Sequence, residues 1–127
     1  MSVGANPADG ELMRLARDKA FDEVIARFRG SSPDGVLLVA DWLREEDIYN
    51  VAIELYRWLL EVNESAAVHF GIGQCFGKIY DYDTALVHLD QAFREDPQRS
   101  EGASYYAYIL ERHERMEEQR QPPSPIA

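Results

Sequence analysis

The chain has 127 residues, of which 46% are hydrophobic and 28% are charged, and its formal net charge is −10 at pH 7. These values predict one soluble, folded domain with a modest core rather than a disordered chain. Apolar runs such as Val36–Ala40 are far shorter than the ~20 residues that a membrane-spanning helix needs. Because an acidic surface repels nucleic-acid phosphates and anionic lipids, we expect neither nucleic acid nor a membrane as a partner.

The sequence also indicates the cellular compartment in which the protein is expected. Cys75 is the single cysteine, so it has no partner for an internal disulfide, which favours a reducing environment. The first ten residues hold no basic patch followed by an apolar stretch, the pattern of a secretory signal. We therefore expect a cytoplasmic protein.

Apolar residues recur at helical spacing along the chain and no segment alternates as a strand would, which predicts an all-α fold. Seven helices are expected, at about residues 8–18, 21–29, 33–46, 49–62, 66–79, 82–95 and 100–119. Residues with side chains suited to N-capping precede four of them: Ser32, Ser65, Asp81 and Ser100. Residues 1–7 are expected to be a flexible N-terminus and residues 121–127 a disordered, proline-rich tail, so the helical domain would span 8–120.

The residues of the predicted helices recur with a spacing near 34. The set Ala85, Leu89, Ala92 and Pro97 corresponds, 33 residues earlier, to Ala52, Tyr56, Leu59 and Glu64. Two helices in a period near 34 residues is the pattern of the tetratricopeptide repeat. Residues 66–99 resemble one such repeat, 33–65 resemble a degenerate copy, and 100–119 resemble the capping helix of this family. The resemblance implies antiparallel helix-turn-helix pairs that stack into a superhelix.

Three glycines within "FGIGQCFG" (Phe70–Gly77) stand where a helix is predicted, although glycine destabilises a helix interior by about 0.5–1 kcal/mol relative to alanine. The resemblance places Gly73 opposite Ala85 at a close helix crossing, where only small residues fit. Ala40 and Ala52 would meet in the same way one repeat earlier. Two interpretations of Gly77 stay open: it leaves room for a ligand on the inner face, or it ends the helix.

Catalytic chemistry is not expected from this sequence. His69, His88 and His113 have no metal-ligand spacing with one another, and Cys75 reads as a small buried hydrophobe. We therefore predict no enzyme activity, no metal, no cofactor and no catalytic residue.

Function is expected to reside in a surface. In tetratricopeptide proteins the first helix of each pair lines a concave groove, so the resemblance implies a partner-binding site there. The candidate residues are Leu37, Asp41, Arg44, Phe70, Gln74, Gly77, Ser104, Tyr108 and Glu111. This lining mixes apolar and acidic side chains, and its expected partner is a protein or peptide segment with apolar anchors and some Lys or Arg.

The leading hypothesis is therefore a non-enzymatic adaptor or scaffold. The alternative rests on a narrower resemblance: "FGIGQC" and "YDYDTALVHL" are similar to the core of the small tetratricopeptide chaperones of bacterial type III secretion. That resemblance implies a chaperone that holds translocator subunits before export.

The predicted fourth helix carries a second apolar stripe, formed by Leu55, Trp58 and Val62. One hypothesis is that this stripe is exposed and makes a homodimer or another contact between proteins. The alternative is that the N-terminal helices bury it.

Overall fold

The computed structural model describes residues 6–120, and over this range the chain is all-α, with no strand. The helices are α1 (Pro7–Arg17), α2 (Phe21–Arg27), α3 (Pro33–Glu45), α4 (Tyr49–Val62), α5 (Ala66–Lys78), α6 (Tyr82–Glu95) and α7 (Ser100–Arg120), with a short 3-10 helix, η1 (Phe28–Gly30), after α2. The seven predicted ranges agree with these bounds to within two residues at each end. None of the described helices is long and apolar enough to cross a lipid bilayer.

The described residues differ from the predicted domain, 8–120, at its N-terminal end. The expected tail, 121–127, and residues 1–5 lie outside the described residues. Asn6 and Pro7, which were expected in the flexible N-terminus, form the start of α1. The Asn6 side chain accepts a hydrogen bond from the Ala8 amide at 2.9 Å, and Pro7 is the first helical residue. Asparagine as N-cap followed by proline is a favourable helix start, because the proline lacks an N–H that would need a partner.

Three of the four predicted N-caps are confirmed. The side chains of Ser32, Ser65 and Asp81 accept hydrogen bonds from the amides three residues later, at 3.0, 3.3 and 3.3 Å respectively. Ser100 differs, because it is itself the first residue of α7, and the Ala103 amide donates to the carbonyl of Arg99.

The helices α1, α3 and α5 end in the same kind of turn. After α3, the Asp47 amide donates to the Arg44 carbonyl and the Ile48 amide to the Leu43 carbonyl, which is the Schellman pattern. The equivalent bonds close α1 and α5. The residue at the tight point has a positive φ each time: 60° at Lys19, 63° at Asp47 and 67° at Tyr80. These turns fold the chain into three helical hairpins: α1–α2, α3–α4 and α5–α6.

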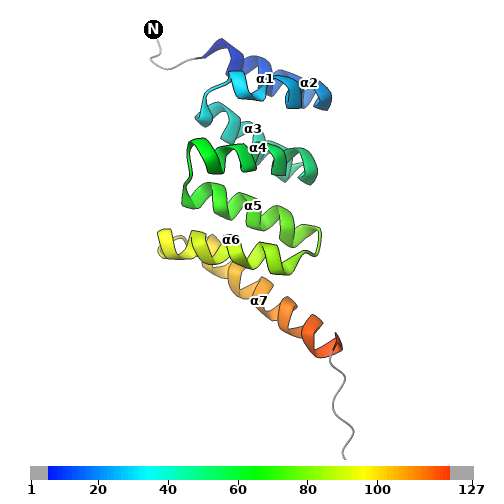
Figure 1. The fold of residues 1–127 in the computed structure, drawn as a ribbon, viewed down its shortest axis with the longest axis vertical. Coiled ribbons are helices and arrows are strands. Elements are labelled where there is room, and N and C mark those ends of the chain that lie inside the picture. The colour runs from blue at the N-terminus through cyan, green and yellow to red at the C-terminus, as the bar shows by residue number, and fades with distance from the viewer. Residues whose placement is uncertain (1–5, 121–127) are drawn as a thin grey trace, which may run out of the picture.

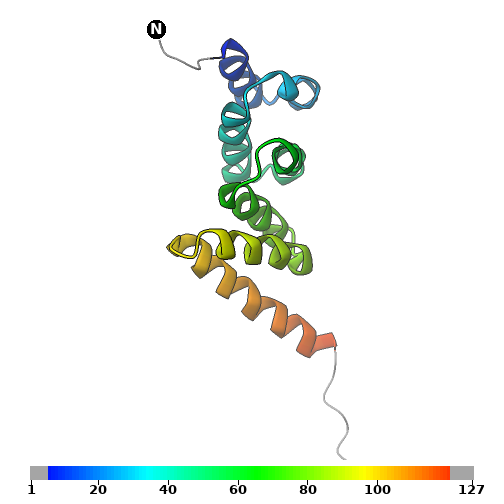
Figure 2. The same ribbon diagram turned by 60° about the vertical axis from the view of Figure 1, so that its left-hand side comes forward.

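The hairpins follow one another along the longest axis of the molecule, from α1 at one end to α7 at the other (Figure 1). The helix α2 packs against α1 and α4, each helix from α3 onward packs against the next, and α1, α3, α5 and α7 also contact one another in succession. These odd-numbered helices therefore form one layer of the stack. The end of α7, a helix of 21 residues paired with the 14 residues of α6, extends past its neighbour (Figure 2).

Two of the three glycines on α5 are explained by close packing inside this stack. A Cβ atom at Gly73 would lie 2.8 Å from the Leu89 side chain and 3.4 Å from the Ala85 carbonyl oxygen. The expected approach of Gly73 to Ala85 is thus observed, with Leu89 as the closer neighbour. A Cβ atom at Gly71 would lie 2.5 Å from the ring of Tyr56, a fully buried side chain. Ala40 and Ala52 are also fully buried in the layer between α3 and α4.

The second apolar stripe of α4 lies mainly inside the molecule. Leu55 is fully buried, and Trp58 packs edge-on against Phe28 with ring centroids 5.6 Å apart. Only Val62 is substantially exposed, at 49%. The hypothesis that all three residues form an exposed surface for a homodimer is therefore wrong. The N-terminal helices bury the stripe, as the alternative had it, because α2 packs against α4.

Candidate functional site

An open groove of about 780 Å³ lies between α3, α5 and α7. Its walls come from the layer of odd-numbered helices and from the turn that leads into α4. The lining residues are Arg44, Glu45, Asp47 and Tyr49 around the end of α3; Phe70, Gln74 and Lys78 on α5; and Ser100, Glu101, Ser104, Tyr105 and Tyr108 on α7. The groove thus joins segments that are up to 64 residues apart in the sequence (108 − 44).

The groove brings together five of the nine predicted partner-binding residues. These are Arg44, Phe70, Gln74, Ser104 and Tyr108. They occupy equivalent faces of α3, α5 and α7, because the side chains at i and i+4 of a helix project on the same side. Alignment of the three helices is therefore sufficient to find the centre of the groove.

Four predicted residues do not line the groove. Asp41 turns toward α4, where its Oδ1 accepts a hydrogen bond from the Tyr56 hydroxyl at 2.5 Å, and Leu37 packs against the core. The space beside Gly77 is filled by Tyr105 and by Ile109, whose Cδ1 would lie 3.0 Å from an added Cβ. Glu111 pairs with Arg115 at 2.7 Å on the exposed side of α7.

Neither of the two interpretations of Gly77 holds. Its missing side chain gives room to α7 rather than to a ligand. It does not end α5 either, because the left-handed residue of that turn is Tyr80. Gly77 is thus a third close-packing glycine.

Several groove residues were missed as partner-binding candidates, and two helices carry signals for them. Lys78 lies four residues after Gln74, which lies four after Phe70, so all three share one face of α5. Tyr105 lies next to the Ser104–Tyr108 face of α7. Asp47 and Tyr49 have no such signal, because only the fold of the turn after α3 brings them to the groove.

One wall of the groove is aromatic. The rings of Phe70 and Tyr105 meet edge to face at a centroid distance of 6.3 Å, and Tyr105 and Tyr108 lie 5.9 Å apart. The Arg99 guanidinium lies 5.2 Å from the centre of the Phe70 ring. Burial raises the pKa of Tyr105 to about 12, so its phenol is neutral at physiological pH. This wall therefore combines the apolar faces of aromatic rings with polar tyrosine hydroxyl groups.

The charges of the groove are mixed, with an acidic excess. The lining carboxylates are Glu45, Asp47 and Glu101, the lining cations are Arg44 and Lys78, and Arg99 lies beside the lining over the Phe70 ring, so the excess belongs to the lining residues alone. Arg44 lies 3.8 Å from Asp41 and 3.9 Å from Glu45, so neighbouring carboxylates already balance its charge. A cationic side chain of a ligand would therefore be attracted to this groove.

Gln74 carries an unpaired polar atom. Its Oε1 is buried, and it is the only buried side-chain oxygen or nitrogen in the described part of the chain that has no hydrogen-bond partner. Such an atom costs roughly 1–3 kcal/mol when no donor reaches it. An N–H or O–H donor from a bound molecule would remove this cost once the Gln74 side chain turns its Oε1 toward the groove.

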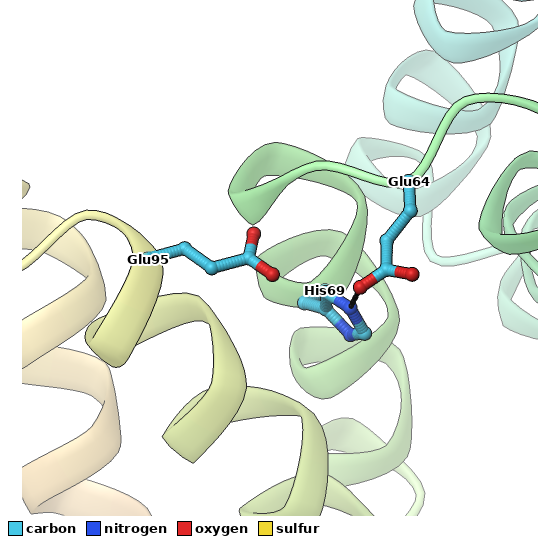
Figure 3. Close-up of side chains that lie close together, drawn as sticks. All are labelled: Glu64, His69 and Glu95. Carbon is cyan, nitrogen blue, oxygen red and sulfur yellow. Dashed lines mark hydrogen bonds and ion pairs between the residues drawn. The ribbon is translucent and has the colours of Figure 1, made fainter.

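A second cluster lies outside the groove and joins His69 to two carboxylates (Figure 3). The Nε2 atom of His69 lies 3.0 Å from Oε1 of Glu64, and Glu95 approaches from the end of α6. The Nδ1 atom of His69 lies 3.1 Å from Nδ1 of His88. Burial, followed by the neighbouring His69, lowers the pKa of His88. Residue spacing alone does not indicate this cluster, because its three members come from the turn before α5, from α5 and from α6.

Cys75 lies outside both the groove and the cluster. Cys75 is buried, and burial raises the pKa of its thiol to about 12, so the thiol is protonated at neutral pH. Comparisons of the chain with protein-family models, with curated proteins and with solved structures found no match.

Proposed function

We propose that this protein is a non-enzymatic adaptor that binds a segment of another protein in the groove between α3, α5 and α7. The observation that carries the proposal is the composition of the groove: an aromatic wall, an acidic excess and one buried acceptor without a donor. Stacked helical pairs commonly bind extended segments on such a surface. The proposal includes the tetratricopeptide character of the repeats, for which the three hairpins are the support.

The residues that line the groove indicate which side chains a partner would need. An apolar or aromatic side chain would pack against the exposed ring of Tyr108 and the half-buried ring of Tyr105, and would remove their apolar area from water, while Phe70 is already buried beneath them. A backbone or side-chain N–H of the segment would donate to Gln74 Oε1. A Lys or Arg would lie toward Glu101, which is exposed at the start of α7. The partner is therefore a segment that carries apolar anchors and at least one cation.

The test begins with affinity capture of partners by the full chain, followed by mass spectrometry. Captured proteins are compared for the wild type and for Glu101→Lys, which reverses a groove charge. Glu114→Lys is the matched control, because it makes the same change at an exposed position of the same helix outside the groove. A second pair is Tyr108→Ala in the groove and Tyr80→Ala at an exposed turn.

The affinity of a peptide from the captured partner is then measured by calorimetry. We expect both groove variants to weaken binding at least ~10-fold, which corresponds to about 1.4 kcal/mol, while both controls bind as the wild type does. Equal binding by all variants would overturn the groove as the site. A captured partner that is insoluble without this chain would favour the more specific function of an export chaperone.

A further inference from the structure

We propose that Glu64, His69 and Glu95 bind a divalent transition-metal ion of the Zn²⁺ class. One ligand atom from each of the three side chains lies within 4.8 Å of the other two. The residues come from the turn before α5, from the first turns of α5 and from the last residue of α6. Figure 3 shows the two carboxylates reaching toward His69 from opposite sides.

The imidazole of His69 is held in a fixed orientation. The residue is 8% exposed, its ring stacks on that of His88 at a centroid distance of 5.4 Å, and His88 in turn stacks on Phe76. The two Nδ1 atoms are 3.1 Å apart, so one donates to the other and Nδ1 of His69 is already engaged. Nε2 is then the atom that faces the carboxylates.

This arrangement matches the outer shell of many metal sites. A ligating histidine almost always uses its second ring nitrogen for a hydrogen bond, which fixes the orientation of the ring. Here the Nδ1 contact with His88 would supply that bond. Metal binding at Nε2 requires the His69 proton to reside on Nδ1, from which it donates to Nδ1 of His88.

The carboxylates lack other strong partners. Within residues 6–120, no Arg or Lys lies within salt-bridge distance of Glu64 or Glu95; Glu64 pairs with His69, and Glu95 accepts a hydrogen bond from Gln91 at 2.9 Å. Both glutamates are exposed, so they can move by the small distance that coordination requires, and water can complete the shell. One imidazole with two carboxylates is a donor set that suits Zn²⁺.

The ion would connect three parts of the last helical hairpin. Glu64 precedes α5, His69 lies on α5 and Glu95 ends α6, so coordination would fasten both helices to the preceding turn. Because the three residues are together only in the folded chain, the metal should stabilise that state. This site lies apart from the groove and does not depend on the adaptor function.

The test is calorimetric titration of the full, metal-free chain with ZnCl₂, together with thermal melts. We expect one ion per chain and a melting temperature that rises with Zn²⁺ concentration. Glu64→Gln and Glu95→Gln should each weaken binding at least ~10-fold, because even the loss of an outer-shell partner costs ~10–100-fold in metal sites. Both positions are exposed, so the variants should fold as the wild type does.

Two controls separate the site from weak binding elsewhere. His113→Asn removes a second histidine that contacts carboxylates, Asp83 at 2.7 Å and Glu117 at 3.9 Å, and Glu54→Gln removes an exposed carboxylate that is not part of the cluster. Both should bind Zn²⁺ as the wild type does, and addition of Zn²⁺ to the wild type should shift the ¹⁵N resonance of His69 Nε2. The proposal is overturned if the wild type binds no ion, if the two glutamine variants bind normally, or if His113→Asn abolishes binding.

Discussion

At the scale of single residues, the glycines of α5 show how packing overrides helix propensity. Gly71, Gly73 and Gly77 each leave room for a large side chain of another helix: Tyr56, Leu89 and Tyr105. The helix loses some intrinsic stability at each position, and the close contacts of its neighbours offset that loss. Gly10 on α1 is different, since an added Cβ would meet nothing within 4 Å.

We predict opposite effects for two alanine substitutions. Gly71→Ala should lower the free energy of unfolding by about 1–3 kcal/mol, because its Cβ would overlap the buried ring of Tyr56. Gly10→Ala should raise it by about 0.5–1 kcal/mol, because alanine favours the helix and meets no obstacle. Urea unfolding followed by circular dichroism measures both. Equal effects in the two variants would show that Gly71 is not a packing position.

Asp41 is a partly buried carboxylate whose ionisation opposes folding. Burial raises the pKa of Asp41 above its usual value, more than the Tyr56 hydrogen bond and the charge of Arg44 lower it. The folded chain therefore retains this proton at a pH where the unfolded chain has lost it. The resulting stability is complete below the unfolded pKa and is lost as pH rises through the folded pKa.

We accordingly predict that Asp41→Asn is more stable than the wild type at pH 7. The asparagine oxygen can still accept the Tyr56 hydrogen bond, and the burial cost that the variant loses outweighs the lost attraction to Arg44, 3.8 Å away. The advantage should vanish below about pH 4, where the wild-type carboxyl is protonated in both states. Urea unfolding of the variant and of the wild type at several pH values tests this. A variant less stable than the wild type at pH 7 would contradict it.

At the scale of elements, each of the three hairpin turns contains a left-handed residue that the sequence does not mark with a glycine. The left-handed residue of such a turn is usually glycine, yet here it is Lys19, Asp47 or Tyr80. The left-handed conformation costs a residue with a side chain roughly 1–2 kcal/mol. These turns therefore form because the helices on either side pack, and not because their residues favour the conformation.

We predict that Lys19→Gly stabilises the protein by about 0.5–1 kcal/mol, since glycine removes the strain at φ 60°. Arg17→Gly, two residues earlier and also exposed, should instead destabilise by a similar amount, because Arg17 is still helical. Thermal melts of the two variants should shift in opposite directions. A loss of stability in both would mean that the turn after α1 does not hold Lys19 in the left-handed region.

At the scale of the whole molecule, the stack is built from contacts between neighbouring helices. The core is nonetheless continuous, because buried side chains of every α-helix belong to one cluster. Trp58 belongs to this assembly, since it joins α4 to Phe28 at the end of the second helix. The N-terminal hairpin thus covers a face of α4 that the repeat pattern would have left open.

We predict that Trp58→Ala lowers the free energy of unfolding by about 2 kcal/mol or more without changing the molecular mass in solution. The reason is the loss of buried aromatic area and of the edge contact with Phe28. Val62→Ala, at the exposed end of the same stripe, should change stability by less than about 0.5 kcal/mol. Light scattering combined with a thermal melt measures both quantities. A stable variant of lower mass would restore the hypothesis that Trp58 lies in a contact between copies.

The sequence by itself determined the helices, most of their caps and the centre of the groove. Helical periodicity and capping are local properties, so residues such as Ser32 and Ser65 carry them without knowledge of the fold. Phe70, Gln74 and Tyr108 were found because equivalent faces of repeated helices point the same way.

The tertiary structure decided where the remaining side chains of the site lie. Asp41 does not line the groove, because it accepts a hydrogen bond from Tyr56 across the α3–α4 crossing. Gly77 does not line it either, because Tyr105 fills the space beside it. Glu64, His69 and Glu95 meet because the end of one helix lies beside the start of another. Contacts of this kind depend on distances between helices, which the spacing of residues within one helix does not contain.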